Sequence, residues 1–567
     1  MHRLARAFTA LVIAAAASLP PSLPATESAL AVGTSATGTW STLGEYRVSP
    51  VPTSLTNRSR EPIVSAHPTN ASKLAVVYAR GPGEESSPVI RISRDGGKTW
   101  RSVSGRPRGG GSHPMVAWGI GPGGGARLWY TAMTGTPDNY HFAISYSDNE
   151  GSTWRLSYIA DNTRGWFGGM EDFVVDTNPA SPLYGAVYLA YNWPKDRSRG
   201  DGFRVVASRN FGRSWSEVEI PKLPAPTGYP DAWRIGYKLT TGPDGTAYVA
   251  GYQLDMKNWS ITCPFCKGGY GNVGRIAFSV TRLRLDKSTG ALTRGTTVLA
   301  TKLPETEWNL GWTPALKGVN VGLAEPCWAT GLVVDEKGRI YYAVAGDGRI
   351  RIVTSDDRGK TWRVRYLPQA PSAGGRSQKS MRPDLVVGKG FVAVLFHTVD
   401  AYGSSRTAGT AAAVTFDRGA TWVGPKPVVT KRWRIAPIIA RYNGPGLRDE
   451  ATLLADGRTI YFGYGDGRDG LSAAFGARIR VTLPVVPPPP PPPSSTPSPS
   501  PSPSDSAAPT ASPPPPASPP PPEPPSTTPV SPSPTASSST APSAVPAEPP
   551  TDPPTDPPSA SPAAPSP

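Results

Sequence analysis

The chain has 567 residues, is rich in glycine and proline, and carries a formal net charge of +16. Residues 1–31 contribute +1 and the residues from 485 onward contribute −5, so the segment between them carries +20. Such a charge attracts polyanions. Because the basic residues are scattered and form no nucleic-acid-binding module, the sequence disfavours nucleic acid and favours glycans or anionic cell-surface polymers as partners.

The first 31 residues have the features of a secretory signal peptide. Arg3 and Arg6 precede an apolar stretch over 7–19, and Ala29-Leu30-Ala31 is a small-x-small cleavage site. The apolar stretch is too short to span a bilayer, and no longer one follows it. We therefore expect a secreted protein that is not membrane-embedded.

An eight-residue pattern, S/T-x-D/N-x-G-x-S/T-W, occurs five times after the signal. Each copy follows an apolar strand and reads as the tip of a β-hairpin, because Asp or Asn with Gly is typical of tight turns. Five copies at domain-scale spacing indicate a repeat architecture. The copies span 93–100, 147–154, 208–215, 355–362 and 415–422.

These turns resemble the Asp-box, or BNR, repeat of sialidases and related β-propellers of secreted bacterial type, over roughly 61–483. The resemblance implies a structural role for the third residue of each turn, whose side chain accepts backbone N–H groups across the turn. It also implies that the glycine supplies a permissive backbone angle and that the tryptophan packs between neighbouring sheets. The third-position residues are Asp95, Asn149, Asn210, Asp357 and Asp417.

Pairs of short apolar strands recur between these turns and fit the two inner strands of a propeller blade. We count seven pairs, at 62–64 with 74–78, 115–117 with 128–130, 173–175 with 186–190, 237–239 with 247–250, 331–334 with 340–343, 385–387 with 391–394, and 451–454 with 459–462. The predicted fold is therefore an all-β propeller of four-stranded blades over 32–484, with seven blades favoured over the six of sialidases.

Two blades lack a clear copy of the repeated turn. A degenerate hairpin at 285–290 supplies one outer pair. The last blade has a single outer strand near 477–483, so we expect its partner to come from the N-terminus near 46–48. Closing the ring with strands from both ends removes an exposed sheet edge.

The segment 485–567 consists almost entirely of Pro, Ser, Thr and Ala. Such a composition cannot bury a core, so we expect an extended, disordered tail. It is interpreted as a spacer or wall-crossing stalk that associates the protein with the cell wall, or alternatively as a solubilising tail.

The chain has three cysteines, Cys263, Cys266 and Cys327. Cys327 is predicted at the start of the fifth blade, beside the fourth-blade loop that holds the other two, and export permits a disulfide between Cys327 and either of them. Zinc is the alternative, but it usually needs more N or S ligands than three cysteines supply. We expect one disulfide and no metal or cofactor.

The repeated turns also indicate which face of the ring to examine. They lie on the turn between the third and fourth strands, so long loops rich in aromatic residues, Trp233 and Trp433 among them, open on the other face. These aromatics either stack on sugars or pack the loops together. Charged residues gather there at the starts of the inner strands, and they either focus charge into one funnel near the axis or form a solvated rim. They are Arg60, Glu61, His113, Glu171, Asp172, Asp231, Arg234, Glu325, Arg382, Asp384, Arg448, Asp449 and Glu450.

The sialidase resemblance implies three components at that face. An arginine cluster for a substrate carboxylate would comprise Arg60, Arg234 and either Arg382 or Arg448. Tyr442 or Tyr402 would be the nucleophile, paired with Glu171 or Glu325. Arg60-Glu61-Pro62-Ile63 differs from the family's Arg-Ile-Pro motif, and no motif singles out an acid/base aspartate.

Two functions follow from these features. The first is a monomeric, secreted, sialidase-like propeller that binds glycans and acts as an exo-glycosidase on acidic sugars. The alternative is a non-catalytic propeller that binds glycans, cell-wall polymers or protein.

Overall fold

The structure is a computed structural model that describes most of the segment between the expected signal peptide and the Pro-rich tail. The described residues are 38–54, 56–81, 87–107, 112–136, 139–160, 172–192, 203–223, 233–254, 276–303, 330–346, 348–370, 378–400, 407–434 and 450–484. The expected signal peptide and Pro-rich tail lie outside these ranges. Across them, no helix has the length and apolar character that crossing a bilayer requires.

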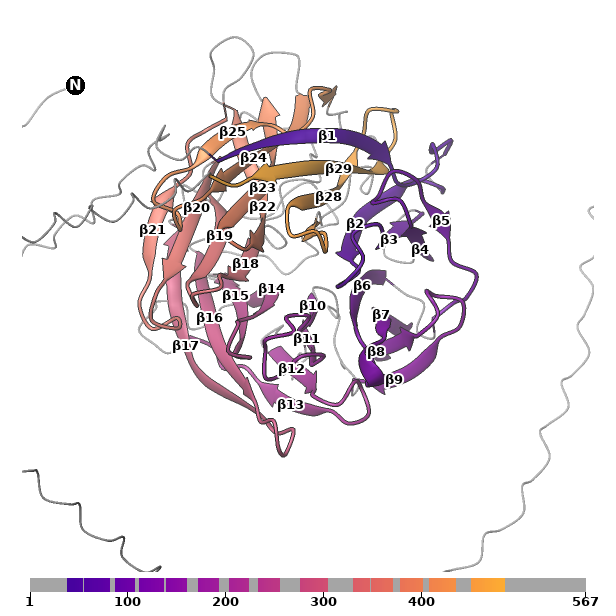
Figure 1. Ribbon diagram of the computed structural model, residues 1–567, viewed down its shortest axis with the longest axis vertical. Coiled ribbons are helices and arrows are strands. Elements are labelled where there is room, and N and C mark those ends of the chain that lie inside the picture. Colours follow the sequence, from indigo (N-terminus) through magenta and orange to yellow (C-terminus); the bar gives the residue numbers. More distant parts are fainter. Residues whose placement is uncertain are drawn as a thin grey trace, which may run out of the picture. The chain divides into compact units, whose positions relative to one another are not determined.

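The described strands form seven antiparallel sheets arranged around a central axis (Figure 1). The prediction of a seven-bladed propeller is confirmed. We number the blades by the chain order of their inner strands. The first three blades comprise β2 (Ser59–Ala66), β3 (Leu74–Arg80), β4 (Ser87–Ser93) and β5 (Arg101–Ser102); β6 (Ser112–Ile120), β7 (Ala126–Thr136), β8 (Asn139–Ser147) and β9 (Arg155–Ile159); and β10 (Asp172–Val175), β11 (Val187–Asn192), β12 (Phe203–Ser208) and β13 (Ser216–Glu219).

Blades 4 to 6 continue the same pattern. They comprise β14 (Trp233–Thr241), β15 (Ala247–Leu254), β16 (Ile276–Leu285) and β17 (Leu292–Leu303); β18 (Thr330–Val334), β19 (Ile340–Gly346), β20 (Arg349–Ser355) and β21 (Arg363–Tyr366); and β22 (Lys379–Gly388), β23 (Phe391–Asp400), β24 (Thr407–Thr415) and β25 (Val423–Pro427), with β26 (Trp433–Arg434) also paired to β24. The degenerate hairpin expected at 285–290 is the turn between β16 and β17.

Blade 7 contains strands from both ends of the propeller. Its order is β27 (Glu450–Leu453), β28 (Thr459–Asp466), β29 (Ala473–Thr482) and β1 (Thr39–Arg47). β1 pairs antiparallel with β29, from Thr39 opposite Thr482 to Arg47 opposite Phe475. This is the closure predicted from the sequence, and it covers an edge that would otherwise be open to other strands.

The five repeated turns, called box turns below, share one hydrogen-bond pattern. In the first, Ser93 Oγ accepts the Gly97 N–H at 2.7 Å, and Asp95 Oδ1 accepts the N–H groups of Lys98 and Thr99 at 3.0 and 2.9 Å. Gly97 has a φ of 90°, which favours glycine. The Trp100 ring lies edge-on to Tyr461 of blade 7, so the turn also joins neighbouring blades.

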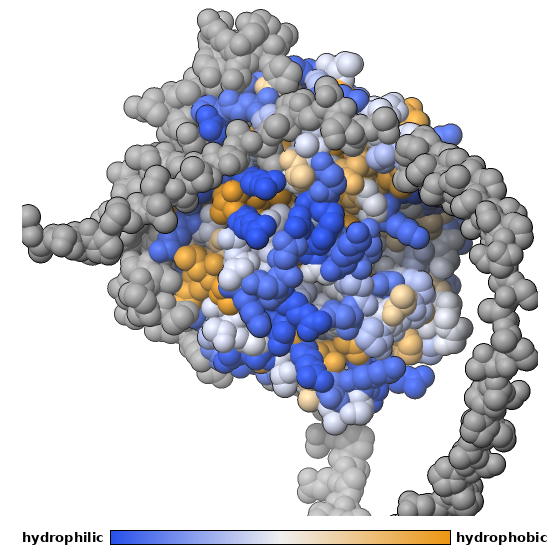
Figure 2. All heavy atoms as spheres, turned by 60° about the vertical axis from the view of Figure 1, so that its left-hand side comes forward, coloured by the Kyte–Doolittle hydropathy of each residue, from blue (hydrophilic) through white to orange (hydrophobic). Residues whose placement is uncertain are grey.

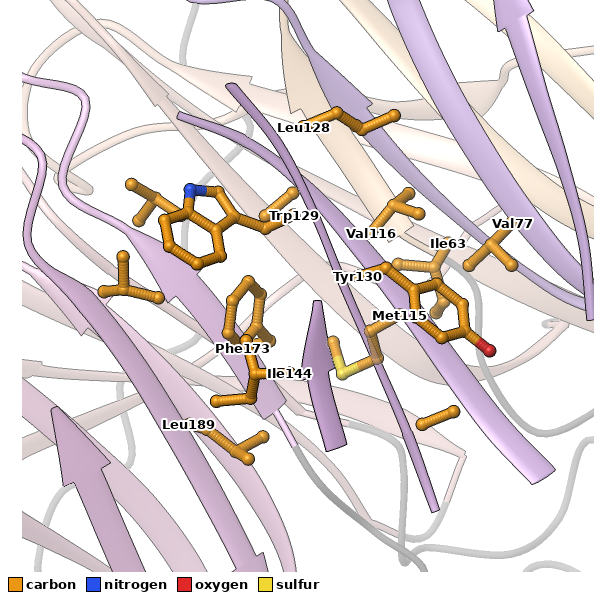
Figure 3. Packing of buried hydrophobic residues seen from close by; sticks show 14 of the residues in the cluster. Ile63, Val77, Met115, Val116, Leu128, Trp129, Tyr130, Ile144, Phe173 and Leu189 are labelled. Atoms are coloured by element: carbon orange, nitrogen blue, oxygen red, sulfur yellow. The ribbon is translucent and has the colours of Figure 1, made fainter. Parts of the chain in front are cut away.

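The core consists of apolar layers between blades, while the outer flank in Figure 2 is largely hydrophilic. Figure 3 shows the layer around blade 2, where Trp129 lies beside Phe173 of blade 3, and Tyr130 lies on the side of Ile63 of blade 1. The Trp129 and Phe173 ring centroids are 6.4 Å apart. Each blade therefore depends on both neighbours for its apolar contacts.

Replacing Trp129 tests this dependence. The side chain is 0% exposed, so we expect Trp129→Ala to lower the free energy of unfolding by about 3–5 kcal/mol. Leu156→Ala on the exposed face of β9 is the control, with an expected change within about 0.5 kcal/mol. Denaturant titration measures both, and similar small losses for the two variants would contradict a packed layer between the blades.

Candidate functional site

The inner strands surround the axis (Figure 1), and four of them are irregular in their pairing. Their pairing with the second strand shifts register between Arg60 and Ile63, Ser112 and Met115, Ile235 and Lys238, and Met381 and Asp384. A bulge lets a strand redirect a side chain, and bulges are common beside active sites. Because the same irregularity occurs in four inner strands, it is a regular feature of the strands around the axis.

Three of these bulges contain a non-glycine residue with positive φ. The angles are 55° at Glu61, 54° at His113 and 52° at Arg382. A proline follows each of the three in the sequence. A left-handed conformation costs roughly 1–2 kcal/mol in a residue with a Cβ atom, so the surrounding sheet must hold the strain, as is typical of functional sites.

Directly after two of the bulges, and at the start of β27, three charged side chains meet. Lys238 Nζ lies 3.2 Å from Glu450 Oε1 and 3.5 Å from Asp384 Oδ1. Lys238 belongs to blade 4, whereas Asp384 and Glu450 belong to blades 6 and 7. Because blade 5 lies between blades 4 and 6 in the ring, the lysine makes these contacts across the central axis. We call Lys238, Asp384 and Glu450 the axial cluster.

Hydrogen bonds between the inner strands of adjacent blades hold the backbone around the axial cluster in place. Asp384 Oδ2 accepts the Ala451 N–H of the next blade at 2.8 Å, and Asp172 Oδ2 accepts the Leu239 N–H of its next blade at 2.6 Å. Each of these aspartates is followed directly by a buried apolar residue, Leu385 after Asp384 and Phe173 after Asp172. Hydrogen bonds between adjacent blades therefore fix the backbone that positions the axial cluster.

The environment of Asp384 changes its acidity. Its side chain is 6% exposed, and burial raises its pKa to about 6, with a further rise from Glu450 that Lys238 and the Ala451 N–H oppose. A carboxyl group with this pKa exchanges a proton near neutral pH, as an acid/base catalyst must. The other two side chains are also sheltered, with 18% of Lys238 and 14% of Glu450 exposed.

Gly331 allows the inner strands of blades 5 and 6 to approach closely beside this cluster. A Cβ atom at Gly331 would lie 2.5 Å from Leu385 N and 2.9 Å from the Asp384 carbonyl carbon. We therefore expect Gly331→Ala to displace the backbone of Asp384 and to lower the free energy of unfolding by about 1–3 kcal/mol. Thermal and denaturant unfolding would measure the loss.

Gly125→Ala is the matched control, since nothing lies within 4 Å of a Cβ atom there and Gly125 has a φ of −68°. Equal stability of the two variants would show that blades 5 and 6 have room to separate.

The arginines predicted to grip a substrate lie partly within the described part of the chain. Arg60, Arg234 and Arg382 belong to β2, β14 and β22 and stand in or beside their bulges. The Arg382 side chain is buried, at 4% exposed. For Arg60 and Arg234, and for Trp233 at the start of β14, only the strand position is described. The topology thus brings three of the predicted arginines to inner strands of the ring.

Several other predicted site residues lie outside the described ranges. They are Tyr442, Tyr402, Glu171, Glu325, Arg448, Cys263, Cys266 and Cys327. Their proposed roles stay predictions. Within the described ranges, no group of three or more His, Cys, Asp or Glu side chains is placed to hold a metal ion.

The predicted structural residues of the box turns lie at the opposite end of the blades. Asn149 Oδ1 accepts the Thr153 N–H, and Asn210 Oδ1 accepts the Ser214 N–H, both at 2.9 Å. Asp417 Oδ1 accepts the Thr421 N–H at 2.8 Å. Asp357 accepts the Thr361 hydroxyl and N–H, which hold its pKa at about 2. The oxygen atoms of these side chains accept hydrogen bonds from their own turns, which is a structural role.

Two aromatic features have packing roles. Trp433 is 3% exposed and stacks on Tyr464, so for this tryptophan the packing alternative holds over sugar stacking. Tyr464 donates to Glu45 in a Tyr–Glu pair, but it is 0% exposed, and burial raises its pKa well above 10. This pair joins β28 to β1, away from the inner strands, and a buried neutral phenol of this kind is a poor nucleophile.

Sequence reasoning missed Lys238 and the special position of Asp384. Lys238 stood inside an apolar strand pattern, and Asp384 was one charged residue among many at strand starts. A local signal was present: each of Asp384, Lys238 and Glu450 is followed directly by an apolar residue of its inner strand, as Asp172 is. Comparing that position across the seven blades would have drawn attention to these four charged residues.

Solved structures with a similar arrangement include three carbohydrate-active proteins. The α-L-arabinofuranosidase Arb93A from Fusarium graminearum is 14% identical, with 63% of this chain and 92% of that chain covered and a TM-score of 0.37. An ulvan lyase is 14% identical, with 76% and 94% covered and a TM-score of 0.42. The endosialidase of phage phi92 is 10% identical, with 79% and 70% covered and a TM-score of 0.35.

No family model matches the chain, and no curated protein matches its sequence. At the identities and TM-scores above, the solved structures do not assign an activity to this chain.

Proposed function

We propose that this protein is an exported, sialidase-like propeller that cleaves glycosidic bonds of acidic glycans at the axial cluster. The observation that carries the proposal is the position of Asp384, a buried carboxyl group near the axis that shares Lys238 with the Glu450 carboxylate. The box turns, which resemble Asp-boxes, and the charge of +20 between the signal and the tail support the choice of an acidic glycan.

The chemistry follows from the two carboxyl groups. Lys238 Nζ contacts both Asp384 and Glu450, at 3.5 and 3.2 Å, so their oxygens are no farther apart than these distances together. That upper limit includes the separation of roughly 5–5.5 Å at which paired carboxyl groups act in retaining glycosidases. In the proposed step, protonated Asp384 donates its proton to the leaving oxygen as the bond to the anomeric carbon breaks. Water or Tyr442 attacks the anomeric carbon and transfers its proton to the Glu450 carboxylate. If Tyr442 is the nucleophile, water then hydrolyses the bond between the sugar and the tyrosine. Arg60, Arg234 and Arg382 bind the acidic group.

A second candidate is a glycan-binding propeller without turnover. It is favoured by the low exposure of the axial side chains and by their mutual ion pairs, which are suited to closing the ring. In that case the axial cluster stabilises the ring, and the glycan binds elsewhere on the face opposite the box turns.

One assay separates the two candidates. Purified protein is incubated with a panel of aryl glycosides, sialosides and uronate-containing polysaccharides, and released sugar, new reducing ends and unsaturated products are measured. Hydrolysis predicts new reducing ends without unsaturated product, and Asp384→Asn should abolish them while Glu217→Gln on an outer strand should not. Binding of a glycan with no product from any member of the panel would reject the enzyme and favour the binding module.

A further inference from the structure

A second feature, on the opposite side of the blades, is a cavity of about 290 Å³ between blades 5 and 6. Four arginines line it: Arg339 immediately before β19, Arg363 and Arg365 on β21, and Arg418 in the box turn of blade 6. This flank of the ring is the one that Figure 2 brings forward, and hydrophilic side chains dominate its surface. The axial cluster contributes no residue to it.

Two of the four arginines hold the cavity wall. Arg339 makes a bidentate pair with Asp356, at 2.6 and 2.7 Å, and its Nη1 donates to the Arg418 carbonyl. Arg418 Nε donates to Asp335 Oδ2 at 2.9 Å, and Asp335 is buried. These contacts join the two blades and fix the shape of the wall, because paired guanidinium groups are rigid donors.

The other two arginines keep their charge available. Arg363 and Arg365 are both exposed and stand two residues apart on β21, opposite Thr354 and Ile352 of β20. Side chains two apart on a strand share a face. Arg365 donates to the Gly419 carbonyl at 3.2 Å, and no carboxylate of the described residues makes an ion pair with either arginine.

The carboxylates near the cavity do not cancel its charge. Asp335 and Asp356 are committed to Arg418 and Arg339, and Asp417 accepts the N–H and hydroxyl of Thr421 within its own turn. Against these three acids stand four arginines. An anion entering the cavity would therefore meet two guanidinium groups that make no ion pair with a carboxylate of the described residues, although Arg365 also donates to the Gly419 carbonyl.

We infer that this cavity binds the sulfate or carboxylate group of an acidic polysaccharide, as a site separate from the axial cluster. Two guanidinium groups on one strand face can donate to the oxygens of a planar or tetrahedral oxyanion, and such charge-assisted bonds are among the strongest polar contacts. The inference rests on the proposed function only in choosing a polysaccharide as the source of the anion.

The test measures binding by the full chain with defined probes. Calorimetry with dextran sulfate and with polygalacturonate should show saturable binding that weakens as salt rises, and uncharged dextran should not bind. Arg363→Gln/Arg365→Gln should weaken binding about tenfold or more. The matched control is Arg282→Gln/Arg284→Gln, which removes two exposed arginines at the same spacing on β16 and should retain wild-type affinity.

Several results would overturn the inference. Equal losses in the two double variants would show attraction by net charge alone, and tighter binding of polyphosphate would reject a polysaccharide as the partner. If the first double variant does not keep the thermal midpoint of the wild type, Arg363→Gln alone is used, and unchanged affinity in that variant rejects the site.

Binding needs no turnover, so Asp384→Asn should still bind dextran sulfate. Failure of the proposed hydrolysis and failure of this site are thereby distinguished.

Discussion

Asp384→Asn is expected to reduce kcat/KM by about 10²-fold or more, because an acid/base group contributes roughly 10²–10⁴-fold to the rate. The asparagine keeps the shape of the side chain and can still accept the Ala451 N–H, but it cannot donate the catalytic proton. For the wild type, the rate should fall as pH rises through about 6, the pKa to which burial brings Asp384. Initial rates from pH 4 to 9 would measure both effects.

The same substitution has a signature in stability. Because the folded-state pKa of Asp384 is raised above its ordinary value of 3.8, the folded protein holds a proton that the unfolded chain releases between about pH 4 and pH 6. The stabilisation is therefore complete below pH 4 and is lost as pH rises through 6, by up to ~3 kcal/mol because folding raises the pKa of Asp384 from 3.8 to about 6. Asp384→Asn should lack this decline.

Glu217→Gln is the control for both measurements, since Glu217 lies 41% exposed in an ion pair with Arg204 on the outer strands of blade 3. Full activity of Asp384→Asn at every pH would remove Asp384 from the reaction. An unchanged pH dependence of stability would show that its carboxyl group is hydrated in the folded protein.

Most of the fold could be predicted because its signals are local. Each box turn carries its own chemistry within eight residues, and each inner pair alternates or runs apolar over a few residues. Blade 7 required one further physical argument, that an open sheet edge is costly, and this led to the N-terminal strand that is β1. No signal in β1 itself, whose burial alternates only weakly, would have placed it there.

The axial cluster was harder to predict because its members are distant in sequence and their directions depend on bulges. Lys238 and Glu450 are 212 residues apart, and a shift of one residue in a strand turns every following side chain to the other face. The dipeptides Glu61-Pro62, His113-Pro114 and Arg382-Pro383 were the available signs of irregular pairing, since proline cannot donate to a ladder. Charge at the strand starts indicated a funnel without showing which groups meet.

The second large effect is expected at Lys238. Lys238→Met should lower the free energy of unfolding by about 3–5 kcal/mol at pH 8, because two sheltered carboxylates would lose the cation between them. At pH 5 the loss should be less than half as large. Lys238 opposes the rise in the pKa of Asp384, so its removal lets Asp384 stay protonated, and a neutral carboxyl group needs no cation. Denaturant titrations at the two pH values would measure the difference.

Two controls separate this explanation from lost packing. Lys73→Met removes an ion pair with Glu150 whose side chains are 30% and 20% exposed, and we expect a change of at most about 1 kcal/mol with little dependence on pH. The triple variant Lys238→Met/Asp384→Asn/Glu450→Gln should regain most of the stability, since no unpaired charge remains. A triple variant no more stable than Lys238→Met, with losses equal at both pH values, would mean that the lysine acts through its aliphatic chain and that the axial charges are screened by water.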